Sequence, residues 1–220
     1  MTPDHHHRIC CIHNRDGSHA QGREVKYGRK RIGAAVTRRC GRTEAPDHEC
    51  SKPMMTSTDV CELYGRFRDL GLEVWIDGGW GVDALLERQT RPHDDLDIVV
   101  QQKDIPKLRR LLEGEGYREV PRDDTSPWNF VLGDDQGREV DVHAVVFDSK
   151  GNGLYGPAEK GVMYPAGSLD GAGLIEGKTV RCIAPEWMIR FHSGYVLKDK
   201  DTWDVAALCE KFGIDNPLAG

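Results

Sequence analysis

Residues 75–97 read Trp-Ile-Asp-Gly-Gly-Trp-Gly-Val-Asp-Ala-Leu-Leu-Glu-Arg-Gln-Thr-Arg-Pro-His-Asp-Asp-Leu-Asp. A short apolar strand leads into Gly78-Gly79, a helix follows, and Asp95 and Asp97 then stand one residue apart. If this last segment is a strand, side-chain alternation places both carboxylates on one face, about 6–7 Å apart. Such a pair is a poor way to stabilise a fold. It suits a hard divalent cation held beside a phosphate chain, which a glycine turn can approach closely.

A third acid lies on a later predicted strand, residues 139–147, where Asp141 and His143 share one face and valines occupy the other. Three converging carboxylates need a physical explanation, because two like charges 4 Å apart repel by about 4 kcal/mol at an effective dielectric of 20. Unless a proton or a cation offsets this repulsion, the cluster lowers stability. With only oxygen ligands and no Cys–His pair nearby, the site favours Mg²⁺ over zinc.

The chain from Met54 onward alternates helical and strand patterns. Apolar spacing predicts helices over 58–70 (with Thr58 as N-cap), 80–88, 105–112, 185–195 and 201–212. Strands are expected over 72–77, 96–100, 128–132, 139–147 and 178–183. The strands at 128–132 and 139–147 should form an antiparallel pair, and residues 148–177, rich in Gly and Pro, are expected to form a loop.

Residues 1–53 differ from the rest of the chain. They carry 11 Lys/Arg and 6 Asp/Glu, a net charge of +5, and show almost no apolar periodicity. Their Cys and His residues could ligate zinc, but the paired spacing typical of zinc sites is absent. A basic arm that binds nucleic acid is the other functional alternative. We expect instead a disordered extension or translated sequence upstream of the true start, because Met54-Met55 directly precedes the first regular element.

Charge and composition exclude several classes of function. Residues 54–220 carry 19 Lys/Arg and 30 Asp/Glu, a net charge of −11, which argues against a general nucleic-acid binder and suits a cationic small molecule. There is no apolar run of 18 residues and no secretory signal pattern, so we expect no membrane span. The seven cysteines lack disulfide-framework spacing, which favours the reducing cytoplasm.

The ordered set of strand, Gly-Gly, helix, Asp-x-Asp and later strand Asp resembles the motif of the DNA polymerase β-type nucleotidyltransferase superfamily. More narrowly, residues 75–100 resemble the lincosamide nucleotidyltransferases, and next the aminoglycoside 2''-adenylyltransferases. Val-Asp-Val-His at 140–143 and Phe-His-Ser-Gly-Tyr at 191–195, with Asp201 and Asp204, match the lincosamide group. The resemblance covers about residues 58–210. Residues 148–177 depart from it and are expected to shape the acceptor pocket.

The resemblance implies an α+β fold, with a nucleotidyltransferase mixed sheet flanked by helices. The core would span residues 54–183, and a short helical part residues 184–220. It also implies Mg²⁺-dependent nucleotidyl transfer from ATP or another NTP to a hydroxyl of a small cationic antibiotic. The favoured acceptor is lincosamide-like, and an aminoglycoside is the alternative.

The resemblance also assigns roles to residues. Asp95, Asp97 and Asp141 would be the catalytic metal ligands, and Asp141 could accept the acceptor's proton. Nucleotide-binding candidates are Gly78, Gly79, Trp80, Arg91 and His93, although Trp80 can instead pack its helix onto the sheet and Arg91 can form a salt bridge. Acceptor contacts are expected from His143, His192 and Tyr195. His192 and Tyr195 can instead pack the C-terminal helices, which is the preferred alternative for Tyr195.

Two further classes of protein share this motif pattern. One is a nucleotidyltransferase-type toxin acting on RNA or protein, but RNA requires a basic surface that residues 54–220 lack. The other is a degenerate, non-catalytic nucleotide-binding module. The presence of all three acids counts against such decay.

Overall fold

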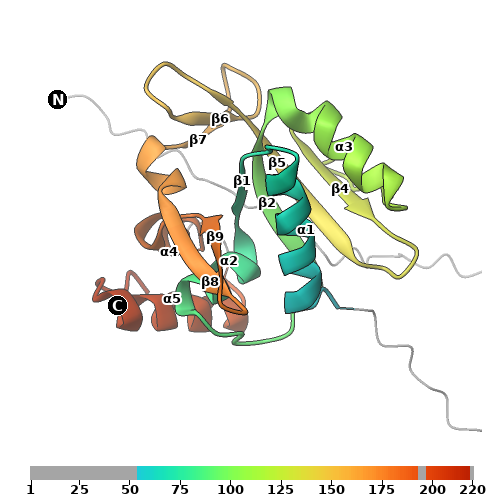
Figure 1. The fold of residues 1–220 in the computed structure, drawn as a ribbon. Coiled ribbons are helices and arrows are strands. Elements are labelled where there is room, and N and C mark those ends of the chain that lie inside the picture. Colours follow the sequence, from blue (N-terminus) through green and yellow to red (C-terminus); the bar gives the residue numbers. More distant parts are fainter. Residues whose placement is uncertain (1–53, 193–196, 219–220) are drawn as a thin grey trace, which may run out of the picture. The chain divides into compact units, whose positions relative to one another are not determined.

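The computed structural model describes residues 54–192 and 197–218 (Figure 1). Its helices are α1 (Ser57–Asp69), α2 (Gly78–Leu86), α3 (Ile105–Gly114), α4 (Pro185–His192) and α5 (Asp199–Phe212), with 3-10 turns η1 (Gln102–Asp104) and η2 (Ala166–Leu169). Its strands are β1 (Val74–Ile76), β2 (Asp95–Gln101), β3 (Arg118–Val120), β4 (Asn129–Gly133), β5 (Glu139–Phe147), β6 (Gly153–Tyr155), β7 (Val162–Tyr164), β8 (Gly171–Ile175) and β9 (Lys178–Cys182). The predictions for residues 1–53 and for Tyr195 lie outside the described residues.

The described strands form one mixed sheet in the order β3-β4-β5-β2-β1-β9-β8, and β6 extends from β5 to pair with β7. Two neighbours run parallel, β2 with β5 and β1 with β9, whereas the other pairs are antiparallel. The central strand β2 carries Leu96, Ile98 and Val99 with no exposed surface. Such an apolar run is typical of a strand covered on both faces. The predicted α+β class with a mixed sheet is confirmed.

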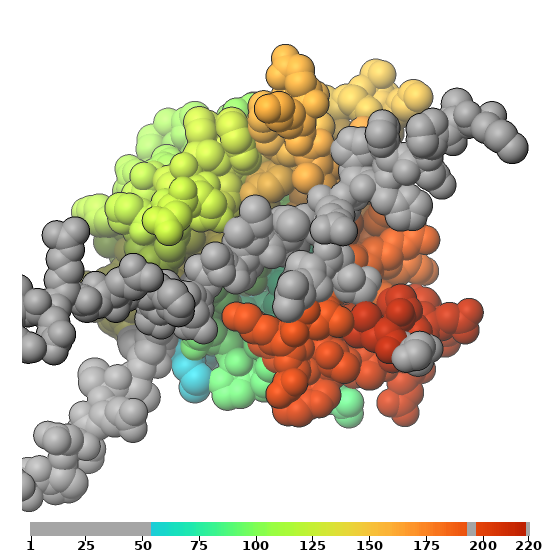
Figure 2. Space-filling view, turned by 180° about the vertical axis from the view of Figure 1, so that it is seen from behind, coloured from blue at the N-terminus to red at the C-terminus, as the bar shows by residue number. Residues whose placement is uncertain are grey.

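Helices cover the sheet and connect it to the C-terminal part. In Figure 1, α1 and α3 lie on the side of the sheet that faces the viewer, and α5 runs across the foot of the picture. Helix α2 contacts β2 and β8 as well as α4 and α5. From behind, α4 and α5 lie in the orange-red and red part of the described surface (Figure 2). The boundary between residues 54–183 and 184–220 stays a prediction.

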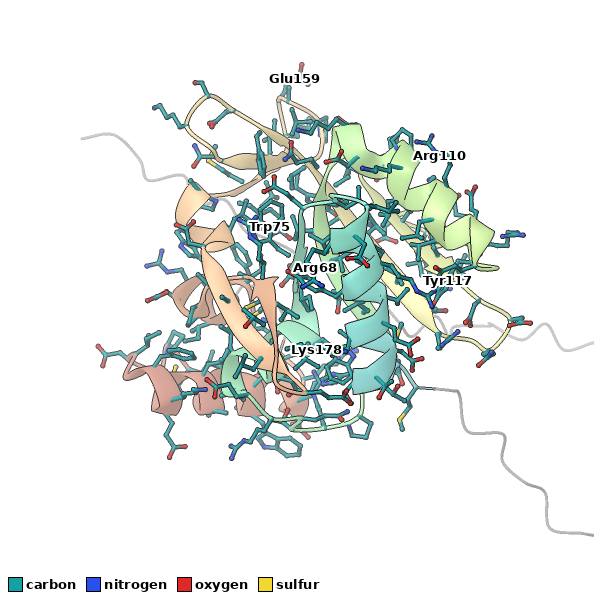
Figure 3. All side chains as sticks on the ribbon, viewed as in Figure 1. Arg68, Trp75, Arg110, Tyr117, Glu159 and Lys178 are labelled. Atoms are coloured by element: carbon teal, nitrogen blue, oxygen red, sulfur yellow. The ribbon has the colours of Figure 1, made fainter. Side chains whose placement is uncertain are left out.

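Trp75 links β1 to the segment that follows β7. Its indole Nε1 donates a hydrogen bond to the Leu169 carbonyl oxygen over 2.6 Å. The Trp75 ring, which is labelled in Figure 3, meets Phe147 edge-on at 5.8 Å, and the Arg181 guanidinium lies 4.6 Å from the ring centroid. These contacts on several sides fix β1, whose end leads directly into the glycine turn. No described helix is both long enough and apolar enough to cross a membrane.

The predicted helices and strands are present, but some of their first and last residues differ from the prediction. Helix α2 begins at Gly78 rather than at residue 80, because the Asp77 side chain caps it by accepting a hydrogen bond from the Gly78 N–H. Residues 148–177 are not the expected loop, since they contain β6, β7, η2 and β8. The short strand β3 was not predicted. Helix α4 ends at His192 within the described residues.

The N-cap of α1 is Thr56, not the predicted Thr58. The Thr56 hydroxyl accepts a hydrogen bond from the Asp59 N–H, and the Asp59 carboxylate accepts one from the Thr56 N–H, which forms a reciprocal capping box. Arg138 holds the same carboxylate at 2.6 Å, so the cap also joins α1 to the start of β5. Thr58 only donates to exposed Glu176.

Replacing the two threonines tests this assignment. We expect Thr56→Ala to lower the free energy of unfolding by about 1 kcal/mol, because the capping hydroxyl is lost. The control Thr58→Ala should change it by less than about 0.5 kcal/mol. Urea denaturation of both variants measures the difference, and equal losses would contradict Thr56 as the cap.

Candidate active site

The parallel pairing of β2 with β5 places Asp97 directly beside Asp141. Both side chains are buried, with 7% and 8% exposure. Among the described residues, one ligand atom each from Asp97, Asp141 and His143 lie within 4.8 Å of one another. Asp95 pairs instead with Glu139, two residues earlier on each strand, and is not part of this group. The structure therefore brings together two of the three predicted acids and adds a histidine.

The glycine turn lies against this cluster. Gly78 has a φ of +56°, a backbone conformation that favours glycine. A Cβ atom at this position would collide with the Asp97 carboxylate. The Asp77 backbone N–H donates to the Asp97 carbonyl over 2.9 Å, so the end of β1 is fixed to β2. The N-terminus of α2, which attracts anions, thus lies next to Asp97.

His143 lies between two carboxylates. Its Nε2 is 3.7 Å from Asp141 Oδ1, and its Nδ1 is 3.9 Å from Asp77 Oδ2. The Tyr164 hydroxyl donates to Asp77 Oδ2 over 3.2 Å and lies 3.5 Å from His143 Nδ1. Asp77, His143 and Tyr164 are all buried. Asp77 and Tyr164 were not among the predicted site residues.

The negative charges around His143 together affect its pKa more than its burial does. Burial alone lowers the pKa of this imidazole, but the interaction with Asp77 and the negative charges of Asp141 and Asp97 raise the pKa above its ordinary value. A protonated ring offsets part of the charge of the cluster when no other cation is bound. This gives a physical reason why the buried carboxylates are tolerated in the folded chain.

Arg91 and His93 lie against the first turn of α2, where a Cβ on Gly79 would meet both side chains. The Arg91 guanidinium donates to Asp204 Oδ2 and to His93 Nδ1, each over 2.9 Å. Because arginine only donates, His93 Nδ1 must accept, and His93 Nε2–H donates to Asp83 Oδ2 over 2.5 Å. The salt-bridge alternative for Arg91 is therefore present, although its partner is the buried Asp204 of α5.

Trp80 and His192 have packing contacts. Trp80 is 1% exposed, and its ring centroid is 4.7 Å from that of His93, so its indole offers no face to a base in this conformation. His192 is buried at the end of α4, where its Nδ1 donates to the Met188 carbonyl over 3.0 Å. The structure does not bring His192 into the group formed by Asp97, Asp141 and His143.

Two observations indicate that the site fits a divalent cation. The donor set consists of two buried carboxylates and one imidazole, all of which are ordinary ligands for such ions. The glycine at position 78 keeps a side chain out of the space beside the Asp97 carboxylate. The sequence predicted carboxylate donors alone, because alternation places His143 on the face of Asp141 but gives no distance between its ring and the Asp97 carboxylate.

Comparison with known proteins gives consistent matches. The family model for aminoglycoside-2''-adenylyltransferase matches residues 59–208. A lincosamide resistance protein of Staphylococcus haemolyticus is 28% identical over 155 residues, which is 70% of this chain and 94% of that protein. A 2''-aminoglycoside nucleotidyltransferase of Escherichia coli is 31% identical over 134 residues, 60% of this chain and 70% of that protein.

Solved structures agree with these matches. The lincosamide adenylyltransferase LnuA, solved with lincomycin, has a TM-score of 0.63 at 25% identity and covers 74% of this chain and 100% of its own. ANT(2'')-Ia, solved with adenylyl-2''-tobramycin, has a TM-score of 0.57 at 25% identity and covers 71% of this chain and 89% of its own. The chain belongs to the aminoglycoside-2''-adenylyltransferase family and is a nucleotidyltransferase.

Proposed function

We propose that this enzyme transfers an adenylyl group from ATP to a hydroxyl of a lincosamide, and so confers resistance to that antibiotic. The observation that carries the proposal is the register pair Asp97–Asp141 beside the N-terminus of α2. Carboxylates that hold a cation and a helix end that binds phosphate are the two elements that phosphoryl-group chemistry requires. The three described cysteines are buried thiols, in keeping with a cytoplasmic enzyme.

In this mechanism the carboxylates hold the cation and accept a proton, and the glycine turn binds phosphate. Asp95, Asp97 and Asp141 would hold Mg²⁺, which when bound neutralises charge on the nucleotide phosphates. The backbone amides that follow Gly78 and Gly79 bind phosphate oxygens. Asp141 accepts the proton of the acceptor hydroxyl while the hydroxyl oxygen attacks the α-phosphorus of the nucleotide. The new bond joins that oxygen to phosphorus, and the bond to the departing pyrophosphate breaks.

Arg91 and His93 support the phosphate-binding turn. A Cβ atom on Gly79 would collide with both side chains, and Arg91 is also anchored to Asp204 on α5. We propose that they position the first turn of α2 and that the Arg91 charge adds to the positive end of the helix. We do not assign Trp80 to nucleotide binding, because its ring is enclosed in the core.

The lincosamide acceptor is supported by the extent of the matches. The aligned region covers 94% of the staphylococcal lincosamide resistance protein but 70% of the E. coli aminoglycoside enzyme. The net charge of −11 over residues 54–220 suits any cationic acceptor and so does not separate the two drugs. An aminoglycoside acceptor is the second candidate, because the matching family model carries that activity in its description.

Mass spectrometry of reaction products tests the acceptor. The full chain is incubated with ATP, Mg²⁺ and either lincomycin, clindamycin, tobramycin or gentamicin. We expect an adenylyl adduct of the lincosamides, and expression in a sensitive host should raise resistance to the same drugs. An adduct of aminoglycosides alone would establish the second candidate instead. No adduct and no resistance to either class would refute the proposed acceptor.

Substitution of the acids tests the catalytic assignment. We expect Asp97→Asn and Asp141→Asn each to reduce adenylyl transfer by at least about 10³-fold, because a cation ligand is lost. Melting temperatures measured without Mg²⁺ should stay unchanged or rise slightly, since each change removes one of two neighbouring like charges. Asp123→Asn, at an exposed position, is the matched control and should leave activity unaltered. A strongly destabilised Asp97→Asn variant with residual activity would indicate a structural role.

A further inference from the structure

We propose that His143 binds the divalent cation through Nε2 as a protein ligand beside Asp97 and Asp141, and that Asp77 and Tyr164 position its ring. The inference rests on the proposed function, because it concerns the cation of the same site. It adds a nitrogen ligand to the carboxylates and assigns a task to two residues outside the Asp-x-Asp motif.

The separation between His143 and Asp141 suits one shared ion. Two ligand atoms that each lie about 2.1 Å from an ion are at most about 4.2 Å apart. His143 Nε2 and Asp141 Oδ1 are 3.7 Å apart, which is inside this limit. The Asp97 carboxylate belongs to the same group of ligand atoms. One ion can therefore contact His143 and Asp141 without a change in the backbone of β5.

The other ring nitrogen has the partners that a metal-binding histidine needs. Such a histidine almost always donates its second N–H to a carboxylate or another fixed acceptor, which sets the tautomer and the ring orientation. Tyr164 donates its hydroxyl hydrogen to Asp77 Oδ2, so its oxygen can accept from His143 Nδ1–H. With the hydrogen on Nδ1, the lone pair of Nε2 is directed toward Asp141.

Both positioning residues are held firmly. Asp77 uses Oδ1 to cap α2 and Oδ2 to accept from Tyr164. The Tyr164 ring, 2% exposed, meets Phe191 edge-on at 5.1 Å, and Tyr155 contacts the His143 ring at 5.4 Å. A ring fixed on both sides loses little freedom when it binds an ion. A loosely held surface histidine would not have this property.

A nitrogen ligand alters which cations bind best. Imidazole favours transition ions over Mg²⁺, and Mn²⁺ is a transition ion that carboxylates also suit. We therefore expect Mn²⁺ to bind this protein more tightly than Mg²⁺. Mn²⁺ is also paramagnetic, so its ligands can be identified directly by spectroscopy rather than from the rate of the reaction.

The decisive experiment is electron–nuclear double resonance on bound Mn²⁺. The full chain is labelled with ¹⁵N in its histidines only and given half a molar equivalent of Mn²⁺ with a non-hydrolysable ATP analogue. We expect a ¹⁵N coupling of a directly bound imidazole in the wild type. His143→Gln should abolish this coupling while Mn²⁺ still binds. The control His192→Gln should retain it. Nitrogen from adenine is excluded, because it carries no ¹⁵N label.

Two outcomes would overturn the assignment. Bound Mn²⁺ without ¹⁵N coupling in the wild type would make His143 a charge-offsetting or acceptor-contacting residue and would leave the nucleotidyltransferase proposal intact. A coupling that persists in His143→Gln would place it on another histidine, including those at positions 5–7. Absence of any Mn²⁺ binding sensitive to Asp97→Asn would instead refute the cation site on which the proposed function rests. The wild-type spectrum decides the question even if His143→Gln does not fold.

The positioning role of Tyr164 is tested by the Mn²⁺ affinity of a variant that lacks only its hydroxyl. Tyr164→Phe keeps the ring that packs on Phe191 and removes only the hydroxyl between His143 and Asp77. We expect Mn²⁺ affinity to fall about tenfold, as is typical when an outer partner of a metal-binding histidine is lost. The ¹⁵N coupling should remain detectable at saturating Mn²⁺. An unchanged affinity would contradict the positioning role of Tyr164.

Discussion

The parallel register of β2 against β5 is the constraint on which the active site depends. It sets Asp97 beside Asp141, two buried carboxylates that would repel by about 4 kcal/mol at 4 Å and an effective dielectric of 20. The opposing force is hydrophobic, because Leu96, Ile98 and Val140 are fully buried. A slip of one residue would turn these side chains out of the core and the carboxylates into it. Burial of apolar surface thus maintains the charge pair to which the proposed mechanism assigns the cation.

The surrounding elements offset the negative charge of Asp97 and Asp141 and fix the positions of these side chains. The imidazole of His143 and the positive end of α2 both approach the pair. Arg91, in the segment between α2 and β2, forms an ion pair with Asp204 of the C-terminal helix α5. The C-terminal helices are consequently bound to the glycine turn by a partly buried ion pair as well as by apolar packing. Loss of either partner leaves a charge unpaired in this region.

Much of this arrangement could be predicted from the sequence, and the limits have physical causes. Alternation along a strand identifies Asp97, Asp141 and His143 as facing residues, but it contains no information on register between strands. The register pairs Asp97 with Asp141 and Asp95 with Glu139, and the part of Asp95 in binding the cation stays a prediction. The capping error differs in kind, because Thr56 and Asp59 already form a visible capping-box pattern three residues apart.

The segment 148–177 was the least predictable, because its strands β6 and β7 have three residues each and Gly and Pro obscure their periodicity. Their pairing depends on β5, a tertiary partner that no local pattern indicates. Asp77 could have been recognised as a helix cap, since it directly precedes the glycine turn. For Tyr164 no sequence signal exists, as its hydroxyl reaches Asp77 across 87 positions of the chain.

The placement of Tyr164 limits which substitutions β7 can accept without a change at Asp77 and His143. Tyr164 lies at the end of β7 with its ring inside the protein, 2% exposed, whereas its neighbour Met163 is 47% exposed, as alternation along a strand requires. A change at Met163 alters the outer surface without touching Asp77. A change at Tyr164 removes a hydrogen bond to the cap of α2 and a contact of His143. The same short strand therefore has an exposed face at Met163 and a buried face at Tyr164 that contacts Asp77 and His143.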